Sequence, residues 1–423
     1  MSAQDLLGMY PHLQTKYVAK LVTQIGVRPE FLASKWMQTK PINDYTIQWD
    51  VKLGLGGMTQ AVAMGAESPP YKGGGYYQRQ MHPAFFREKQ VVMPHQLMWK
   101  RKLGTLNEME NVRAFIDEKV IEGKQRVDIR VEHSLWQAIL GSLSINSNLV
   151  KFDVDYAVPS RYLPVLTGVD RWTQTTSANP LDDMLAWVYL FRGSGFEAAE
   201  FIYNGYVERL LYDNTAIRQV KTTITTGGRP ELLTMANLNE ILQTYVGNYK
   251  FTKYDGFYVM TTELTALGVV GANTVTVHDV TGIEANDTLR LISYSANGDT
   301  LYDQICTVAS VLGTTVTLNE NLEFAFPIGS FLYMSKPFLP DNKVIVRAKH
   351  PTGLGTEGES AYGNFITTLS EYGEGNMLAP KPGVFAETVV NDKVDPKRID
   401  IITGVNGLPV RYRNDDFIVA TIF

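Results

Sequence analysis

Histidine side chains have the widest chemical range in this sequence, because imidazole binds metals when neutral and transfers protons near neutral pH. No two of the six fall at the spacing by which a helix or a turn would join two metal ligands. They are His12, His82, His95, His133, His278 and His350. We therefore expect no metal site and take His133 to be a packed or surface residue. A site built from two histidines distant in the sequence is the alternative.

Two glycine-rich runs raise the question of phosphate binding. Gly54–Met58 and Lys72–Tyr77 are not followed by a helix signal, and neither ends in Gly-Lys-Ser or Gly-Lys-Thr, so they lack the pattern that cradles a phosphate. Gly193–Glu197 comes close to a nucleophile elbow but does not have the Gly-x-Ser-x-Gly order. These runs predict flexible chain rather than an active site.

The remaining chemical candidates have simpler interpretations. Asp182 and Asp183 follow a proline at a predicted helix start, and Asp415 and Asp416 lie in a predicted turn. The single cysteine, Cys306, lies in an apolar alternating stretch, where inert burial is expected, and it excludes an internal disulfide. We expect no catalytic residue and no cofactor.

Composition points to a large globular protein without strong nucleic-acid affinity. The chain has 423 residues, 44% of them hydrophobic, and a formal net charge of −5 with no cationic block. Avid binding of nucleic acid needs clustered lysine and arginine, whereas a protein that merely encloses it can be mildly acidic. We expect neither a signal peptide nor a membrane span, since no apolar run reaches the necessary length.

Residues 41–95 are predicted to form a long hairpin with a glycine-rich tip. Tyr45–Gly54 alternates with period two, as a strand does, and Ala84–Pro94 is a second extended stretch. An isolated hairpin is marginal in water and exposes its edges, so we expect other copies of the chain as its partners. A glycine-rich enzyme lid is the alternative. The preceding residues 1–40 are predicted to be an arm with short helical stretches.

The region from about Leu106 to Leu140 is predicted to be one long helix, which at about 1.5 Å per residue would span about 50 Å. Gly123 predicts a bend or break, and Gly141 a stop. The helix has an apolar stripe at spacings of three and four. The stripe comprises Val112, Phe115, Ile116, Lys119, Val127, Val131, Leu135, Ala138 and Ile139.

The rest of the chain alternates helices with strands, which indicates a mixed α/β body. A helix is predicted to begin at Pro180, capped by Asn179, and another to end at Gly247. Residues 266–335 differ, because they contain only short Val-, Thr- and Leu-rich strands separated by turn residues. This texture predicts an inserted all-β sandwich or barrel.

These elements, in this order, resemble the lambda-type (E family) major capsid proteins of tailed bacteriophages, which have the Hong Kong 97-type capsid fold. Pro83–Leu97 is similar to the returning limb of that family's E-loop, Glu108–Leu140 to its spine helix, and Asp395–Phe423 to its C-terminal ending. The resemblance implies an α+β fold with seven parts. They are an N-terminal arm (1–40), an E-loop hairpin (41–95), the spine helix and P-domain strands (96–165), an A-domain (166–265), the inserted β-domain (266–335), an A-domain return and loop (336–380) and C-terminal P-domain strands (381–423).

The resemblance also implies a function. Such a protein self-assembles into the hexamers and pentamers of an icosahedral head, encloses double-stranded DNA without sequence-specific binding, and is not an enzyme. Portal, scaffolding and decoration proteins are the implied partners, with no membrane, and the implied location is the virion after assembly in the host cytoplasm. Gly123 is the implied hinge when the shell expands, and Lys72 is not expected to cross-link. The expected inter-subunit contacts are Trp49, Met58, Met64, Tyr71, Tyr76, Tyr77, Phe85 and Phe86.

Two other functions fit the same residues. One is a carbohydrate-active or other α/β enzyme with an appended β-module, which would be a small oligomer with a pocket of perturbed carboxylates. The other is a different virion structural protein, such as a component of a tail tube or baseplate.

Overall fold

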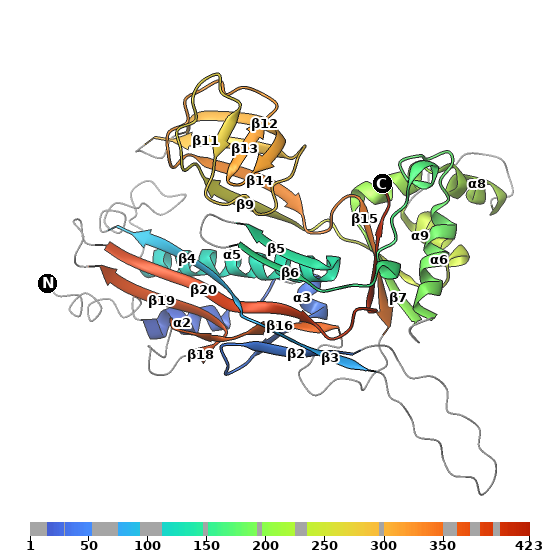
Figure 1. The fold of residues 1–423 in the computed structure, drawn as a ribbon, viewed down its shortest axis with the longest axis horizontal. Helices are drawn as coiled ribbons and strands as arrows, with labels where there is room; N and C mark the ends of the chain where they lie inside the picture. The colour runs from blue at the N-terminus through green and yellow to red at the C-terminus, as the bar shows by residue number, and fades with distance from the viewer. Residues whose placement is uncertain are drawn as a thin grey trace, which may run out of the picture. The chain divides into compact units, whose positions relative to one another are not determined.

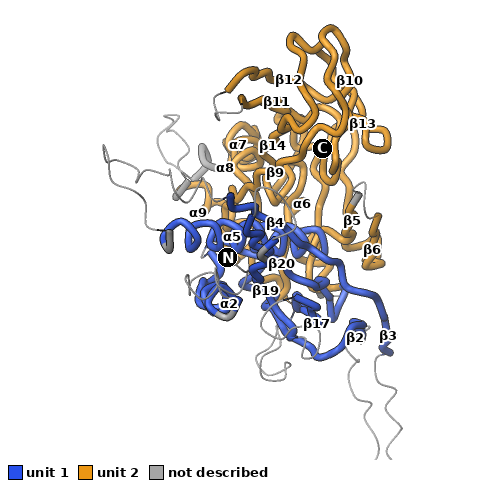
Figure 2. Tube along the Cα trace, turned by 90° about the vertical axis from the view of Figure 1, so that its left-hand side faces the viewer, with its two compact units in different colours: residues 1–138, 350–414 blue, residues 139–349, 415–423 orange. Residues whose placement is uncertain are grey.

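The computed structural model divides the chain into two compact units (Figure 2). Unit 1 comprises residues 1–138 and 350–414, and unit 2 comprises residues 139–349 and 415–423. The structure describes residues 15–28, 30–52, 75–93, 112–146, 151–192, 197–224, 235–295, 300–349, 362–372, 381–391 and 398–423. Within these ranges, no helix combines the length and apolar character that a membrane span requires.

Unit 1 is built on a sheet whose central strand, β20, is 14 residues long. β20 pairs antiparallel with β4 and β19, and its C-terminal part pairs with β16 (Figure 1). β16 in turn pairs with β1 in parallel. The strands are β1 (Thr39–Pro41), β4 (Ala84–Val92), β16 (Gly363–Thr367), β19 (Val384–Asn391) and β20 (Arg398–Arg411). A small pair, β17 (Leu369–Ser370) with β18 (Lys381–Pro382), lies beside this sheet.

Two helices contribute to the apolar core on one face of this sheet. They are α2 (Thr15–Gln24) and the 29-residue α5 (Val112–Leu140). Val18 and Val22 of α2 share a buried cluster with Phe115, Ile116 and Val120 of α5 and with sheet residues such as Ile401. The sequence predicted an arm with short helical stretches; the described part of this segment does contain helices, and it is packed on its own unit.

The long helix runs without interruption through Gly123, so the expected break there is wrong. A Cβ atom at Gly123 would lie 2.5 Å from Oγ1 of Thr403, a buried residue of β20. The glycine lets the helix and the sheet approach each other closely. Close packing therefore accounts for a glycine at this position, and no break in the helix is needed to explain it. The expected stop at Gly141 is present, with a φ of +110°.

The hairpin also differs from the expectation. β2 (Ile47–Lys52) pairs with β3 (Tyr76–Met81), and the expected returning limb at 84–94 belongs instead to β4 in the sheet. Pairing with β20 from Ala84↔Gly407 to Val92↔Ile399 satisfies the edge hydrogen bonds that a free hairpin limb would leave exposed. Residues 53–74, which include the expected glycine-rich tip, lie outside the described residues.

Unit 2 contains a four-stranded sheet in the order β21-β15-β7-β8, packed with helices around a large apolar core. The strands are β7 (Glu197–Tyr203), β8 (Lys250–Lys253), β15 (Lys343–Lys349) and β21 (Phe417–Thr421), and the helices are α6 (Pro180–Arg192), α7 (Gly205–Asp213), α8 (Thr215–Ile224) and α9 (Met235–Tyr245). The C-terminal strand β21 pairs with β15. The sequence had placed it with the P-domain strands, but its pairing with β15 puts it in unit 2, where four of its five residues are buried.

Further short elements of unit 2 precede α6. The hairpin of β5 (Ser142–Asn146) and β6 (Lys151–Asp155) follows the long helix, and two 3-10 turns, η2 (Ser160–Tyr162) and η3 (Gly168–Asp170), follow the hairpin.

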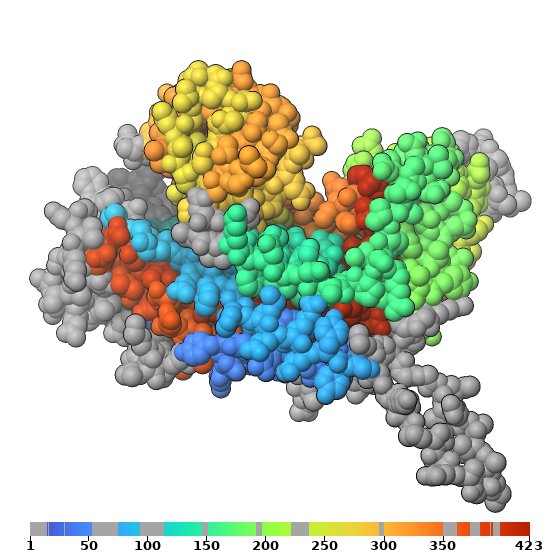
Figure 3. Space-filling model, in the orientation of Figure 1, coloured from blue at the N-terminus to red at the C-terminus, as the bar shows by residue number. Residues whose placement is uncertain are grey.

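The second part of unit 2 is a six-stranded all-β body, residues 257–337, which we call the β-module. It is the yellow-to-orange rounded body in the space-filling view (Figure 3). Its strand order is β10-β13-β12-β11-β14-β9, and its core contains fifteen buried residues between Leu264 and Met334. The module begins nine residues before the expected 266, because the entering strand pairs with the leaving strand from Phe257↔Pro337 onward. The strands are β9 (Phe257–Glu263), β10 (Thr274–Thr276), β11 (Thr288–Tyr294), β12 (Thr300–Leu312), β13 (Thr315–Leu318) and β14 (Phe331–Pro337).

Candidate assembly surfaces and polar networks

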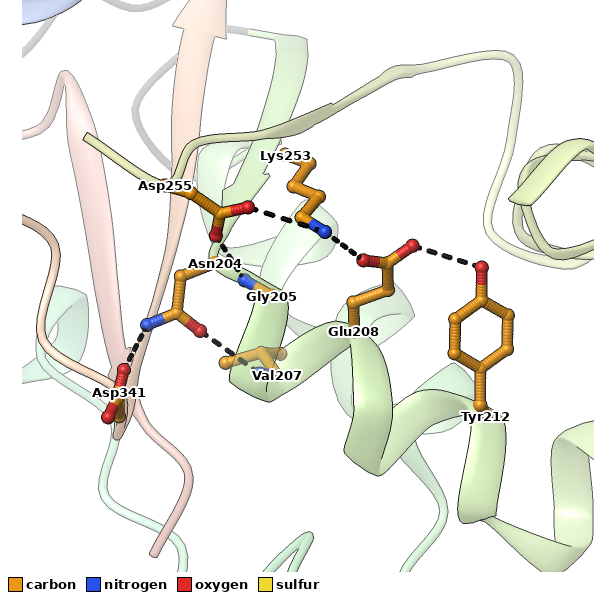
Figure 4. A network of polar contacts seen from close by, with 8 residues as sticks. All are labelled: Asn204, Gly205, Val207, Glu208, Tyr212, Lys253, Asp255 and Asp341. Carbon is orange, nitrogen blue, oxygen red and sulfur yellow. Dashed lines mark hydrogen bonds and ion pairs between the residues drawn. The ribbon is translucent and has the colours of Figure 1, made fainter. Parts of the chain in front are cut away.

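A polar network lies in unit 2 where β7 leads into α7 (Figure 4). Asn204 is the N-cap of α7, and its Oδ1 accepts a hydrogen bond from Val207 N at 3.0 Å. Its Nδ2 donates to Asp341 Oδ1 at 2.6 Å. One buried side chain thus satisfies an amide of the first helical turn and ties the helix to the segment that precedes β15.

Lys253 is the cation of the same network (Figure 4). Its Nζ lies 2.7 Å from Glu208 Oε2 and 3.3 Å from Asp255 Oδ2. The hydrogen bond with Glu208 raises the pKa of Lys253. Burial, together with a hydrogen bond to Glu208, raises the pKa of Tyr212 to about 12. Lys253 therefore stays charged and Tyr212 stays protonated at neutral pH, which suits a structural role rather than proton transfer.

A second network surrounds Glu200 in the same sheet. Its side chain is 2% exposed and lies 2.8 Å from Arg347 Nη2 and 2.8 Å from Lys250 Nζ. These two residues are its cross-strand neighbours on β15 and β8. Burial alone would raise the pKa of Glu200, but hydrogen bonds from Lys250, Thr252 and Arg347 outweigh it and lower the pKa. The ionised carboxylate therefore joins three strands.

In unit 1, Glu132 of α5 holds the short helix α3 (Ala33–Trp36). Its carboxylate is fully buried and accepts hydrogen bonds from Ala33 N (2.8 Å), Ser34 N (2.9 Å) and Trp136 Nε1 (2.8 Å). Ser34 Oγ also donates to it, and Trp36 packs edge-on against Trp136. A negative charge at the start of a helix satisfies free amides there, so Glu132 fixes the N-terminal segment to the long helix.

The residues singled out for possible chemistry are spread over both units. Asp183 accepts a hydrogen bond from Trp172 Nε1, and Asn179 Nδ2 donates to Asp182, so all three serve the start of α6. Cys306 is buried in β12, and burial raises its pKa to about 11. His133, Asp415 and Asp416 are buried. In the described part of the chain, no three His, Cys, Asp or Glu side chains gather into a group that could hold a metal.

The expected contact residues fall into four groups. Tyr76 and Phe85 are 72% and 58% exposed, which leaves them available to another subunit. Trp49 is 4% exposed, so its packing is within its own unit. Tyr77 accepts a hydrogen bond from Asn414, and the guanidinium of Arg130 lies over Phe86, so both are partly engaged within unit 1. Met58, Met64 and Tyr71 lie outside the described residues.

Sequence reasoning missed the apolar surface of the β-module. Of the 22 large hydrophobic residues found exposed in the described ranges, twelve lie between Phe257 and Ile328. Their alternation with buried residues identifies strands but does not separate a solvent face from a docking face. The sequence feature that could have drawn attention to this surface is the charge of the module, which carries very few basic residues.

Comparison with known proteins identifies a family and similar solved structures for this chain. The chain matches the family described as Phage major capsid protein E over residues 14–281, more than half of its length. A protein described as a prophage capsid protein, from E. coli CFT073, has a similar structure at 12% identity and a TM-score of 0.50, covering 97% of this chain and 99% of its own.

Two further solved structures align over most of the chain with lower scores. A phage-related protein from Bordetella bronchiseptica RB50 has 10% identity, a TM-score of 0.45 and coverage of 96% and 95%. A virus-like particle from Pyrococcus furiosus has 9% identity, a TM-score of 0.39 and coverage of 97% and 99%. No curated protein matches the sequence. The family match and the shared α+β capsid fold confirm the expected resemblance: this chain belongs to the phage major capsid protein E family and is a capsid-forming structural protein.

Proposed function

We propose that the chain forms the hexamers and pentamers of an icosahedral phage head that encloses double-stranded DNA. The family match over residues 14–281 carries this proposal. The formal charge of −5 supports enclosure without sequence-specific binding, because tight phosphate binding needs clustered basic residues. We further propose assembly in the host cytoplasm, with portal, scaffolding and decoration proteins as partners.

We propose that the chain performs no catalysis. Two buried carboxylates, Glu132 and Glu200, are each held by several hydrogen bonds or ion pairs from their own unit. A general acid or base must reach a substrate proton, and these two groups are instead used to fix strands and helices.

We propose the seven-part organisation implied by the resemblance, with three changes. The inserted domain becomes 257–337, because β9 and β14 are paired along their length. Residues 84–92 join the P-domain strands, and residues 417–421 join the A-domain strands, because of their pairing with β20 and β15. Gly123 remains a proposed hinge, although its helix is continuous.

We propose Tyr76 and Phe85 as inter-subunit contacts. Large aromatic side chains that remain exposed in a subunit are typical anchors of protein interfaces. Their exposed fractions of 72% and 58% contrast with 4% for Trp49, which cannot contact a neighbour without rearrangement.

The test is assembly of the purified full chain, followed by sedimentation velocity and negative-stain microscopy. We expect shells or capsomers for the wild type and a shift toward free subunits for Tyr76→Ser with Phe85→Ser. Tyr245→Ser, at a tyrosine that is 49% exposed on α9, is the matched control and should assemble normally. A small discrete oligomer would favour the enzyme alternative, and tubes would favour a tail component.

A further inference from the structure

The net negative charge of the protein is concentrated in the β-module. Residues 257–337 contain two basic and eight acidic residues, a formal charge of −6, whereas the rest of the chain has 37 basic and 36 acidic residues. Both basic residues are already paired within the module. Arg290 lies 2.6 Å from Asp303, and Lys336 lies 2.8 Å from Asp287.

One part of the module also has a concentrated apolar surface, formed where segments 264–272 and 322–330 lie side by side. Gly268 and Phe326 exchange two backbone hydrogen bonds, and Gly271 N donates to Leu322 O. These segments, together with Tyr302 of β12, present large side chains to solvent, and we call this set of side chains the ribbon patch. Its members, with their exposed fractions, are Leu267 (58%), Val269 (56%), Val270 (57%), Phe324 (36%), Ile328 (67%) and Tyr302 (37%), the last stacked on Phe324 at 5.0 Å.

Two carboxylates lie close to the ribbon patch along the chain: Glu323 directly precedes Phe324, and Glu320 lies on the segment that leads into residues 322–330. Glu320 accepts hydrogen bonds from Thr307 N and Oγ1, both at 2.7 Å, which lower its pKa and keep it ionised. Glu323 is exposed, and its backbone amide is fixed by Gln304 Oε1 at 2.9 Å. No described basic side chain forms an ion pair with either carboxylate. An apolar centre with an acidic rim is therefore held in place by the module's own hydrogen bonds.

The negative charge of the module favours some binding partners of the ribbon patch over others. A nucleic acid or an anionic membrane would be repelled by a surface of this sign. A second β-module would bring a second charge of −6 to the contact, and like charges across an interface oppose association. A protein that presents arginine or lysine beside apolar side chains is complementary, since guanidinium groups pair with carboxylates and stack on aromatic rings.

We infer that the ribbon patch is the docking site for a basic partner protein, which uses apolar side chains at the centre and Arg or Lys at the rim. This inference rests on the proposed function, because it identifies the place where a head-associated partner would bind. It also adds the chemical class of that partner, which the family match does not supply.

The test uses two short synthetic peptides as probes, one alternating leucine and arginine and the other with glutamate at each arginine position. We expect the basic peptide to bind the full-length protein at least about tenfold more tightly at low salt, with affinity falling as salt is added. Fluorescence anisotropy of the labelled peptides measures this difference. Val269→Ser and Glu323→Lys should each weaken binding about threefold or more, as expected for loss of an apolar contact and reversal of a rim charge.

Two matched variants provide the controls. Glu240→Lys makes the same charge change at an exposed position of α9. Leu312→Ser removes a leucine that is 83% exposed at the β12–β13 turn, outside the ribbon patch. Both should bind like the wild type. Equal binding of the two peptides, or equal losses in patch and control variants, would overturn the inference.

The same samples separate this inference from the proposed function. Shells that form normally but do not prefer the basic peptide would remove the docking site and leave the capsid role intact. If Val269→Ser abolished assembly while peptide binding stayed unchanged, the patch would belong to a contact between copies of this chain, and the inference would be wrong.

Discussion

Replacement of Gly123 by alanine tests how the long helix meets the sheet of unit 1. A Cβ atom at this position would lie 2.5 Å from Thr403 Oγ1 and 2.9 Å from Thr403 Cγ2. Thr403 is 1% exposed and therefore has little room to move. Helix and strand would have to separate by roughly 1 Å to restore an ordinary contact of about 3.5 Å.

Two effects oppose each other in this variant. Alanine favours a helix interior by about 1 kcal/mol over glycine, while overpacking a close contact costs about 1–3 kcal/mol. We expect the contact to dominate, with a net loss of about 1–2 kcal/mol from the free energy of unfolding of unit 1. Gly123→Ala combined with Thr403→Ala should recover that loss, because the second change removes both nearest atoms.

Thr403→Ala alone should be close to neutral. Its hydroxyl is buried without a hydrogen-bond partner in the described part of the chain. Removing such a hydroxyl relieves a cost of about 1–3 kcal/mol, which offsets the lost burial of a methyl group, about 1 kcal/mol. The two sites should therefore couple by about 1–3 kcal/mol in a double-mutant cycle.

Hydrogen exchange of the α5 and β20 amides is the suitable assay, because it measures opening of unit 1 separately from unit 2. If Gly123→Ala protected these amides as well as or better than glycine does, or if the two substitutions were additive, the close-packing explanation would be refuted. A hinge at Gly123 would then be the better explanation for glycine at this position.

Three further predictions follow from the polar networks and the module. Glu132→Gln should destabilise α3 by about 2 kcal/mol, since a buried charged acceptor loses strength; hydrogen exchange at Ala33 and Ser34 measures this, and unchanged protection would contradict it. The lowered pKa of Glu200 means that its contribution to stability is complete above the ordinary glutamate pKa of 4.5 and is lost as pH falls through the lower folded-state pKa. Measuring the free energy of unfolding against pH should show this loss. The Glu200→Gln variant should show a smaller loss over the same pH range. Residues 257–337 expressed alone should melt cooperatively, because the core of the module is internal and its ends are paired; a broad, non-cooperative transition would count against an independent module.

Local elements could be predicted from the sequence because their signals are local. The helix from Pro180 to Arg192 has its start signal in adjacent residues, and the apolar stripe of α5 includes Phe115, Ile116 and Leu135, all buried. The strands of the β-module were visible as short Val- and Thr-rich runs between turns.

Strand partners could not be predicted, because pairing depends on residues far apart in the chain. β4 had the pattern of a hairpin limb, yet its partner β20 lies about 300 residues further on. β20 contains Gly404, Gly407 and Pro409, which are residue types that weaken or interrupt a strand pattern. A Cβ atom at Gly404 or Gly407 would lie 2.5 or 2.6 Å from the carbonyl oxygen of Phe86 or Ile366, so these glycines allow neighbouring strands to approach.

The polar networks could not be predicted from the sequence either, because they too join residues that are far apart in the chain. Asn204, Lys253 and Asp341 are ordinary surface residue types in the sequence, and only the fold brings them to one helix start. The exposure of Tyr76 and Phe85, in contrast to burial of Trp49, likewise depends on which face of each strand is covered.

The most direct test of the central claim is electron cryo-microscopy of particles purified after expression of the full chain. The account predicts closed shells whose repeating subunit contains the α5–β20 packing of unit 1 and a separate β-module in each copy. A single discrete oligomer of fixed small size, with no shells or capsomers under any assembly condition, would contradict it.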